Sequence, residues 1–589
     1  MSEHFVELKF GTSGLRDTVE NMTDMECYIN TKGFLLYLKK IGEFKSRDKV
    51  ALAGDRRPST RRIKKAVAMA IHDMGGVSDD QGLVPSPSLA FYAMKRGIAS
   101  IMVTGSHIPS DRNGIKFTKK SGEVLKSDEQ GILESVRDTR NEIAESTSIK
   151  IVFNKKRMFT EKVALEAEFF LKEPEYAGES AVEYIKRYTD IFGFARPLTG
   201  KKIFLYQHSA VGRDIIKEIF EGAGAGVYAP SSEITLQYKD ENEKGKSEKE
   251  FLRSKAFISV DTESVSNKTM AVFEKVMNDE NIDIGISMDG DSDRPLLVYR
   301  VYENNKPTKE VRYVTGDVLG LLTIMSLENM DVRIDAIAVP VSANDMIDEI
   351  LLGKGVKISR TKIGSPYVIA AMNESISRYR NEARNEWNVF SWEANGGFLT
   401  GSNVCINNNI LTALPTRDAC LPLLAVIIWA EKQKKKISQI IDSLPKRFTH
   451  ADRIKDFSME YSARVLNLIR PKKEKEVVEI EFTGGALVKA FYNGDVKKNF
   501  NSGEFFEIKK TLEKFFNINQ GFAEIIKINY VDGVRIYFAN GEVAHLRPSG
   551  NAPEFRNYSL AGTPNRAREI VKMVLEEIVP RMAKEGKDV

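Results

Sequence analysis

Short apolar runs alternate along most of this chain with longer segments in which apolar residues recur at helical spacing. Residues 50–53 are a strand candidate, residues 61–74 follow with a helical pattern, and residues 99–103 form the next apolar run. Such an alternation is typical of an α/β fold with largely parallel sheets, in which ligands bind at the carboxyl ends of the strands. The first cycle therefore predicts a ligand site just after residue 103.

The same alternation continues in two further cycles. The glycine run GAGAGV at residues 222–227 follows a helical pattern and precedes a strand pattern, which is the reverse of the order in a dinucleotide-binding loop. We interpret it as a helix end followed by a tight turn. The predicted elements of these cycles are strands at residues 202–206, 282–288 and 336–340, helices at 213–220, 345–352 and 413–430, and a turn at 361–368.

The character of the chain changes after the polar segment at residues 431–436. Strand-like runs then dominate, and residues 565–584 carry an amphipathic helical pattern, which indicates an α+β domain. We therefore predict three tandem mixed-sheet α/β domains plus a smaller C-terminal α+β domain. The predicted domains are residues 1–195, 196–305, 306–435 and 436–589, with the charged stretch 131–188 as a candidate insertion in the first.

Composition narrows the class of protein. The 87 basic and 82 acidic residues leave a net charge of only +5, which does not favour a nucleic-acid partner. The three cysteines are far apart, which excludes a disulfide framework and a CxxC metal site and fits a reducing cytoplasm. The N-terminus has no signal-peptide pattern, and the most apolar run, residues 420–430, is too short to span a membrane. We expect a cytoplasmic protein.

An acidic loop, DGDSDR, follows the strand candidate at residues 282–288. Asp289, Asp291 and Asp293 occupy alternate positions, so in an extended loop all three carboxylates can converge on one hard cation. An EF-hand calcium loop is excluded, because its glycine and glutamate positions are Arg294 and Arg300 here. A solvated acidic turn remains the alternative. The spacing favours Mg²⁺, which usually completes its coordination with water and phosphate oxygens.

The stretch TGSHIPSDRNGIKF, residues 104–117, sets Ser106 beside His107 in a loop bounded by turn residues, with Lys116 further on. A serine hydroxyl is a poor nucleophile unless it is activated, and His107 is not obliged to face it. An unmodified Ser106 would therefore need a nearby base, whereas a phosphorylated Ser106 could supply a phosphate oxygen to the cation; an ordinary surface loop is the alternative.

A third polar loop, RPSGNAPEFR at residues 547–556, offers two guanidinium groups, a hydroxyl, a side-chain amide and backbone N–H groups. This combination can clamp a dianionic phosphate. A turn beside a basic patch is the alternative.

Four loops in this order, TGSHIP, DGDSDR, WEANGGF at residues 392–398 and RPSGNAPEFR, resemble the α-D-phosphohexomutase superfamily, which includes phosphomannomutase and phosphoglucomutase. FGTSGLR at Phe10, GDRRPS at Gly54 and GLVPSPS at Gly82 extend the resemblance over nearly the whole chain. The resemblance implies an isomerase of carbohydrate metabolism whose four domains surround a central cleft. It interconverts hexose 1-phosphate and hexose 6-phosphate through a phosphoserine and a hexose 1,6-bisphosphate, with one Mg²⁺ per chain. Small-molecule hexose phosphates are its expected ligands, and a monomer or a dimer its expected assembly.

The resemblance also implies a role for each matching residue. Ser106 carries the transferable phosphate and joins the metal ligands, and the cations near it handle protons and stabilise charge. The implied catalytic residues are Ser106, His107, Lys116 and Arg16; the implied metal ligands are Ser106, Asp289, Asp291 and Asp293; and the implied substrate-binding residues are Arg294, Thr361, Gly364, Glu393, Asn395, Arg547, Ser549, Gly550, Asn551 and Arg556.

Three departures from the family pattern concern the substrate. The serine loop reads SHIP where the family commonly has SHNP. The resemblance assigns residues 392–398, here called the sugar loop, to the sugar hydroxyls, and they read Asn-Gly-Gly for Ser-Gly-His; it assigns residues 547–556, here called the phosphate loop, to the non-reacting phosphate, and they read SGNAP for SGTEP. The sequence therefore leaves mannose, glucose and glucosamine phosphates open. A sugar-phosphate phosphatase is disfavoured, because a second phosphate clamp and a sugar loop are superfluous to hydrolysis. A noncatalytic sensor is disfavoured, because Ser106 and all three aspartates are present.

Overall fold

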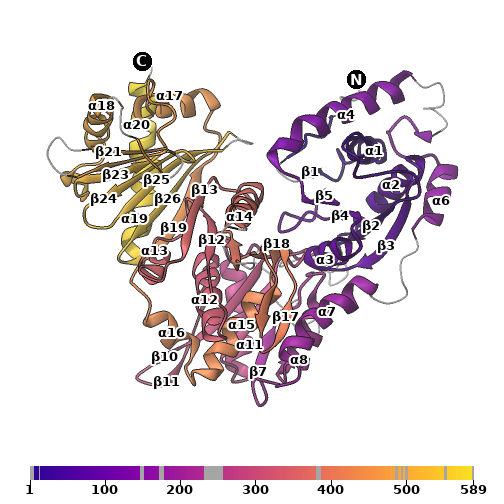
Figure 1. Cartoon of the computed structure of the whole chain (residues 1–589), viewed down its shortest axis with the longest axis horizontal. Coiled ribbons are helices and arrows are strands. Elements are labelled where there is room, and N and C mark those ends of the chain that lie inside the picture. Colours follow the sequence, from indigo (N-terminus) through magenta and orange to yellow (C-terminus); the bar gives the residue numbers. More distant parts are fainter. Residues whose placement is uncertain are drawn as a thin grey trace, which may run out of the picture. The chain divides into compact units, whose positions relative to one another are not determined.

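The computed structural model describes residues 6–11, 14–145, 152–171, 178–230, 257–379, 387–483, 488–492, 495–497, 500, 502–549 and 553–586. The chain forms two compact units, Met1–Ala338 with Gly364–Asp442 (unit 1) and Val339–Ile363 with Ser443–Val589 (unit 2). Figure 1 shows the elements of both units, coloured along the chain.

The first sheet of unit 1 has the strand order β1-β5-β4-β2-β3, with β6 paired to β5. Strand β2 is parallel to β3 and β4, whereas β5 is antiparallel to β1 and β4, so the sheet is mixed as predicted. Its strands are β1 (Gly14–Thr18), β2 (Lys49–Gly54), β3 (Val77–Leu83), β4 (Ala99–Val103), β5 (Arg112–Lys119) and β6 (Gly122–Glu123).

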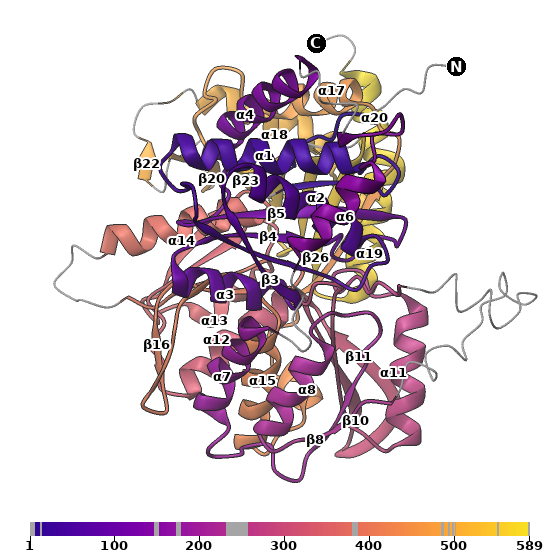
Figure 2. The same cartoon turned by 90° about the vertical axis from the view of Figure 1, so that its right-hand side faces the viewer.

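Helices cover both faces of this sheet, with α1, α2, α4 and α6 on one face and α3 on the other, and α7 packs against α3 (Figure 2). Ile132 of α4 and Val163 of α6 belong to the same buried core as Phe34 of α1 and Ile101 of β4. Residues 131–145 and 152–171 of the 131–188 stretch therefore contribute to this core. The helices are α1 (Asp24–Lys40), α2 (Thr60–Asp73), α3 (Ser86–Arg96), α4 (Lys126–Glu145), α6 (Glu161–Phe169) and α7 (Glu179–Phe192).

The second sheet has the order β11-β10-β9-β7-β8, and β9 delivers the acidic loop at its carboxyl end. The hairpin of β10 and β11 carries this sheet to Val314, beyond the predicted domain boundary between residues 305 and 306. The glycine run at residues 222–227 joins the end of α8 to β8, as interpreted from the sequence. The elements are β7 (Lys202–Leu205), α8 (Arg213–Gly222), β8 (Gly226–Tyr228), α11 (Asn267–Asp279), β9 (Ile284–Met288), β10 (Pro295–Glu303) and β11 (Lys306–Val314).

A third group of strands in unit 1 has the order β12-β14-β15-β18. The helix predicted from residue 413 begins only at Cys420, because residues 414–418 form β18, which pairs with β15. Pairing with a neighbouring strand outweighs the local helical pattern here. The elements are α12 (Gly316–Asn329), β12 (Ala336–Pro340), α14 (Ser365–Tyr379), β14 (Val389–Trp392), β15 (Phe398–Thr400), β16 (Val404–Ile406), β17 (Asn409–Leu411), β18 (Leu414–Asp418), α15 (Cys420–Lys432) and α16 (Ile437–Asp442).

Unit 2 contains an antiparallel sheet of order β19-β26-β25-β24-β23-β20-β21-β22, with helices packed on its buried face. This arrangement is the α+β architecture predicted for the C-terminal region. The elements are α13 (Met346–Leu351), β13 (Lys357–Thr361), β19 (Phe448–Ile454), α17 (Met459–Ile469), β20 (Glu479–Phe482), β21 (Val488–Tyr492), β22 (Asp495–Lys497), α18 (Ser502–Glu513), β23 (Ile525–Asn529), β24 (Val534–Phe538), β25 (Val543–Pro548), β26 (Phe555–Ala561), α19 (Pro564–Met573), the π-helical turn Val574–Ile578 and α20 (Val579–Glu585).

Within the part of the chain that the structure describes, no helix has the length and hydropathy that a membrane span requires.

Candidate active site

Ser106 lies in the loop after β4, and its side chain is buried. Its φ of 55° is in the left-handed region, which costs a residue other than glycine about 1 kcal/mol. Its backbone N–H donates to Thr104 Oγ1 over 2.8 Å, and the Thr104 hydroxyl donates to Asp55 over 2.8 Å. The loop therefore holds Ser106 in one strained conformation, as functional loops often do.

Arg57 clamps the same loop from the end of β2. Its guanidinium donates to the backbone carbonyls of Ser106 over 2.9 Å and of Ile108 over 2.5 Å, and also to those of Pro109 and Arg112. Asp55 balances its charge at 3.1 Å, and both side chains are fully buried. We assigned no role to Arg57 from the sequence, because its partners lie about 50 residues away along the chain.

The metal loop, residues 289–294, meets the serine loop directly. The Ser106 hydroxyl donates to Asp289 Oδ2 over 2.6 Å. Gly290 permits this approach, because a Cβ atom there would lie 2.4 Å from the Ser106 carbonyl oxygen. Ser86, in the GLVPSPS segment, donates to Asp291 from both its hydroxyl and its backbone N–H.

The three aspartates form one buried cluster. Ligand oxygens of Asp289, Asp291 and Asp293 lie within 4.8 Å of one another. Lys116 donates to Asp291 Oδ2 and, over 2.8 Å, to Asp293 Oδ2. The Oδ1 atoms of Asp291 and Asp293 are buried without a hydrogen-bond partner in the described structure. Buried carboxylate oxygens of this kind need a cation or a donor, so the cluster fits a metal ion.

The electrostatics of the cluster support the same conclusion. Burial raises the pKa of Asp289 well above its usual range, and the charges of Asp291 and Asp293 raise it further. Burial also acts to raise the pKa of Asp291, but the charge and hydrogen bond of Lys116 outweigh it and hold that pKa far below its usual range. A second cation beside Lys116 would relieve the repulsion that Asp289 experiences.

His107 is partly buried among cations. Its Nδ1 accepts from Arg294 over 2.9 Å and lies 3.4 Å from the Ser106 hydroxyl. Burial lowers the pKa of His107 to about 3, with further lowering by Arg294 and Arg16, so the imidazole is neutral at physiological pH. Burial, and then Arg294, lower the pKa of Arg16 to about 10, which leaves it charged. These groups place fixed positive charge around Ser106.

The sugar loop joins this cluster through a residue that the sequence reading missed. Glu393 follows β14 and is buried, and its Oε2 accepts from Arg417 over 2.8 Å. Arg417 also donates to Asp293 Oδ2 from Nε and Nη2, at 3.0 and 2.9 Å. Asn395 shapes the loop itself, because its side-chain oxygen accepts from the Gly397 N–H over 3.0 Å.

The phosphate loop lies in unit 2, where β25 and β26 place Arg547 opposite Arg556. Arg547 donates to Asp532 over 2.9 Å, and the backbone N–H of Ile363 donates to the same carboxylate oxygen over 3.0 Å. The turn after Thr361 is thereby tied to Arg547 within unit 2. The Ser549 N–H donates to the Glu554 carbonyl, which closes the loop.

The predicted site residues thus fall into two groups. Those brought together in unit 1 are Arg16, Ser106, His107, Lys116, Asp289, Asp291, Asp293, Arg294 and Glu393, with Asn395 in the adjoining loop. Gly364 also belongs to unit 1, and Thr361, Arg547, Ser549 and Arg556 belong to unit 2. Gly550 and Asn551 lie outside the described residues.

Comparison with known proteins identifies related sequences over nearly the whole chain. Residues 7–142 match the phosphoglucomutase/phosphomannomutase alpha/beta/alpha domain I, and residues 315–448 match domain III of the same proteins. A phosphomannomutase of Salmonella muenchen is 33% identical over 98% of this chain and 97% of its own length. A phosphomannomutase of Sinorhizobium fredii is 31% identical over 96% of this chain and 97% of its own length.

Solved structures share the fold at lower identity. A phosphoglucomutase/phosphomannomutase family protein of Burkholderia thailandensis has a TM-score of 0.61 at 16% identity, covering 98% of this chain and 97% of its own. A Paramecium phosphoglucomutase has a TM-score of 0.57 at 15% identity, covering 98% and 94%. The N-acetylphosphoglucosamine mutase of Aspergillus fumigatus, solved with GlcNAc-6P and magnesium, has a TM-score of 0.52 at 12% identity, covering 100% and 97%.

Proposed function

Because this chain belongs to the phosphoglucomutase/phosphomannomutase family and is therefore an intramolecular phosphotransferase, we propose that it interconverts mannose 1-phosphate and mannose 6-phosphate. The observation that carries the proposal is the contact of the Ser106 hydroxyl with Asp289 inside a buried cluster of three carboxylates. Mannose is favoured among the hexoses because two relatives, at 33% and 31% identity, are named phosphomannomutases.

In the proposed reaction Ser106 carries the phosphate of the resting enzyme. The bond between Ser106 Oγ and phosphorus breaks as the free 1- or 6-hydroxyl oxygen of the sugar phosphate bonds to phosphorus. The hydroxyl proton ends on Ser106 Oγ, and Lys116 is the group we assign to handle it. The product is hexose 1,6-bisphosphate, which reorients and returns its other phosphate to Ser106. The hydroxyl form of Ser106, hydrogen-bonded to Asp289, corresponds to the state between the two transfers.

The positively charged side chains around Ser106 can stabilise the negative charge of the phosphoryl group during its transfer. Arg16, Lys116 and Arg294 lie around Ser106, so they can stabilise charge on the equatorial phosphoryl oxygens as it moves. His107 is held neutral by its surroundings and positions Arg294. Asp289, Asp291, Asp293 and an oxygen on Ser106 would hold one Mg²⁺, which when bound would withdraw negative charge from the phosphoryl group.

The remaining residues are assigned to the substrate. Glu393 can accept hydrogen bonds from sugar hydroxyls, with Asn395 and Gly364 in the surrounding loops. Arg547 and Arg556 would hold the phosphate that does not react. Thr361, Ser549, Gly550 and Asn551 complete the set that we assign to this phosphate. We place the enzyme in the cytoplasm, as a monomer or a dimer.

A steady-state comparison of hexose 1-phosphates tests the proposal. Mannose, glucose and glucosamine 1-phosphates would be assayed with Mg²⁺ and a trace of hexose 1,6-bisphosphate. We expect the highest kcat/KM for mannose 1-phosphate. Preference for the glucosamine compound would instead make this enzyme a phosphoglucosamine mutase. Release of inorganic phosphate without isomerisation would make it a sugar-phosphate phosphatase.

A further inference from the structure

Two neighbouring glycines of the sugar loop are glycines for different reasons. Gly396 has a φ of 83°, in the left-handed region that favours glycine. Gly397 has no such backbone requirement. Instead, a Cβ atom on Gly397 would lie 2.6 Å from Cδ and 2.7 Å from Cγ of Arg417. Position 397 therefore lacks a side chain because Arg417 fills its space.

The Arg417 side chain occupies this space and bridges the metal loop and the sugar loop. It extends from β18, the strand that pairs with β15 beside the sugar loop. Its three donated hydrogen bonds, two to Asp293 and one to Glu393, are between 2.8 and 3.0 Å long. One guanidinium thus fixes a metal-loop carboxylate and a sugar-loop carboxylate at the same time, a geometry that the planar fork of arginine suits.

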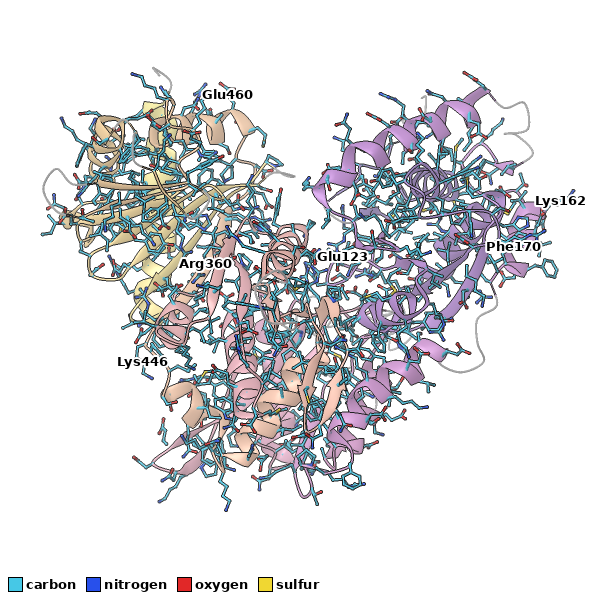
Figure 3. The ribbon with its side chains drawn as sticks, viewed as in Figure 1. Glu123, Lys162, Phe170, Arg360, Lys446 and Glu460 are labelled. Atoms are coloured by element: carbon cyan, nitrogen blue, oxygen red, sulfur yellow. The ribbon has the colours of Figure 1, made fainter. Side chains whose placement is uncertain are left out.

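The surroundings hold the guanidinium in place. Arg417 is only 8% exposed, so its charge must be balanced by neighbouring groups. Glu123 of β6, labelled in Figure 3, lies beside the same strand, and the Thr416 hydroxyl donates to its Oε1. The hydrogen bonds to Asp293 engage only Oδ2; its Oδ1 is buried without a hydrogen-bond partner in the described structure and lies 3.8 Å from Arg294 Nε.

We propose that Arg417 is a positioning residue of this enzyme, which ties Asp293, the assigned metal ligand, to Glu393, the assigned sugar ligand, and fills the space that a side chain at position 397 would need. It acts through these two carboxylates and sets the distance between the phosphoryl group and the sugar hydroxyls. The inference rests on the proposed function, since it concerns the same mutase site.

The test compares Arg417→Met, Arg417→Lys and Gly397→Ala with the parent in two measurements: mutase kinetics, and calorimetric titration of the dephosphorylated protein with Mg²⁺. Arg417→Met should raise KM for mannose 1-phosphate about tenfold, because Glu393 loses a charge-assisted hydrogen bond. It should bind Mg²⁺ more tightly, because a positive charge beside Asp293 is gone. Arg417→Lys should fall between, since an ammonium group cannot reproduce all three hydrogen bonds. Gly397→Ala should displace Arg417 and raise KM although the arginine is present.

Arg300→Met is the matched control. Arg300 is a buried arginine of unit 1 whose partners, including Asp283 and Asn278, lie outside the site. Arg300→Met should lower thermal stability, but it should neither raise KM nor tighten Mg²⁺ binding. Unchanged KM in both Arg417→Met and Gly397→Ala would overturn the inference, as would weaker Mg²⁺ binding in Arg417→Met with stability loss like that of the control. If Arg417→Met does not fold, Gly397→Ala and Arg417→Lys decide. A parent without activity on any hexose phosphate would overturn the proposed function, while the Mg²⁺ titration would still test the bridge.

Discussion

Ser106 and Asp289 are 183 positions apart along the chain, yet the hydroxyl of one donates to the carboxylate of the other over 2.6 Å. Each residue lies in a loop at the carboxyl end of a strand, Ser106 after β4 and Asp289 after β9. The contact brings a group that can carry phosphate against a group that can bind a cation. Phosphorylation of Ser106 and cation binding by Asp289 therefore affect each other.

Replacing Ser106 should remove mutase activity without unfolding the protein. Ser106→Ala deletes the hydroxyl oxygen that we assign to phosphoryl transfer, and alanine keeps the backbone N–H that donates to Thr104. Intact-mass analysis of the freshly purified parent should show a phosphorylated fraction that maps to Ser106. Full mutase activity in Ser106→Ala would exclude the phosphoserine mechanism.

Replacing Asp291 should lower kcat at least ~100-fold, because electrostatic stabilisation of this kind is commonly worth about 3 kcal/mol. Asp291→Asn keeps the shape of the side chain but removes the charge that pairs with Lys116. Asp283→Asn is the control. Asp283 lies just before β9, the strand that leads into the loop of Asp291, and it pairs outside the site with Arg300 and Lys436. Turnover that persists undiminished in a metal chelator would contradict the assignment of the acidic cluster.

Two adjacent arginines should respond differently to the same substitution. Arg57→Lys loses most of the bonds to four loop carbonyls, and kcat should fall between about 10- and 100-fold as Ser106 shifts. Arg56 pairs with Asp214 at 3.1 Å near the surface, so Arg56→Lys should keep the parental kcat. Equal kcat values for the two variants would show that the clamp on the serine loop is dispensable.

The sequence predicts those parts of the site that lie within single loops. The alternate spacing of Asp289, Asp291 and Asp293 follows from the loop alone, and the structure brings their carboxylates together. Arg57 and Arg417 were not predicted, because the partners of Arg57 lie about 50 residues away and those of Arg417 lie 124 and 24 residues away, in other loops. Arg417 was further concealed by its position in a segment that we predicted as helix, where strand pairing prevails.

Acid should weaken unit 2 through His545. Its imidazole is buried, and its Nε2 donates to the Asp532 carbonyl over 2.5 Å. Burial, and then Arg535, lower the pKa of His545 from 6.5 to about 3. A lowered histidine pKa means that the unfolded chain binds the proton more readily, so stability falls as pH drops from 6.5 towards 3, by about 2 kcal/mol at pH 5. His545→Gln should lack this component.

Hydrogen exchange of peptides from β24 and β25, corrected for the intrinsic effect of pH, is the suitable measurement. Tryptophan fluorescence would not report on unit 2, because Trp387, Trp392 and Trp429 all belong to unit 1. The difference in exchange free energy between pH 7 and pH 5 should be smaller in His545→Gln than in the parent. The same difference in both proteins would remove His545 as the source of acid sensitivity.

Replacing Arg547 should weaken substrate binding without preventing the phosphorylation of Ser106. The residue lies in unit 2 and pairs with Asp532, whereas the groups that we assign to phosphoryl transfer lie in unit 1. Arg547→Ala should therefore weaken binding of both the monophosphate and the bisphosphate, by the ~1.5 to 3 kcal/mol of a charge-assisted hydrogen bond, and yet leave Ser106 phosphorylated in the purified protein. Because the bisphosphate then escapes before it reorients, the variant should depend more strongly on added hexose 1,6-bisphosphate than the parent does. Activity would be measured against bisphosphate concentration for both proteins, with Arg566→Ala as a control, since Arg566 is an arginine of α19 in the same unit that pairs with Glu542, outside the phosphate loop. Superimposable activation curves and an unchanged KM in Arg547→Ala would exclude Arg547 from the phosphate site, whatever the outcome at Ser106.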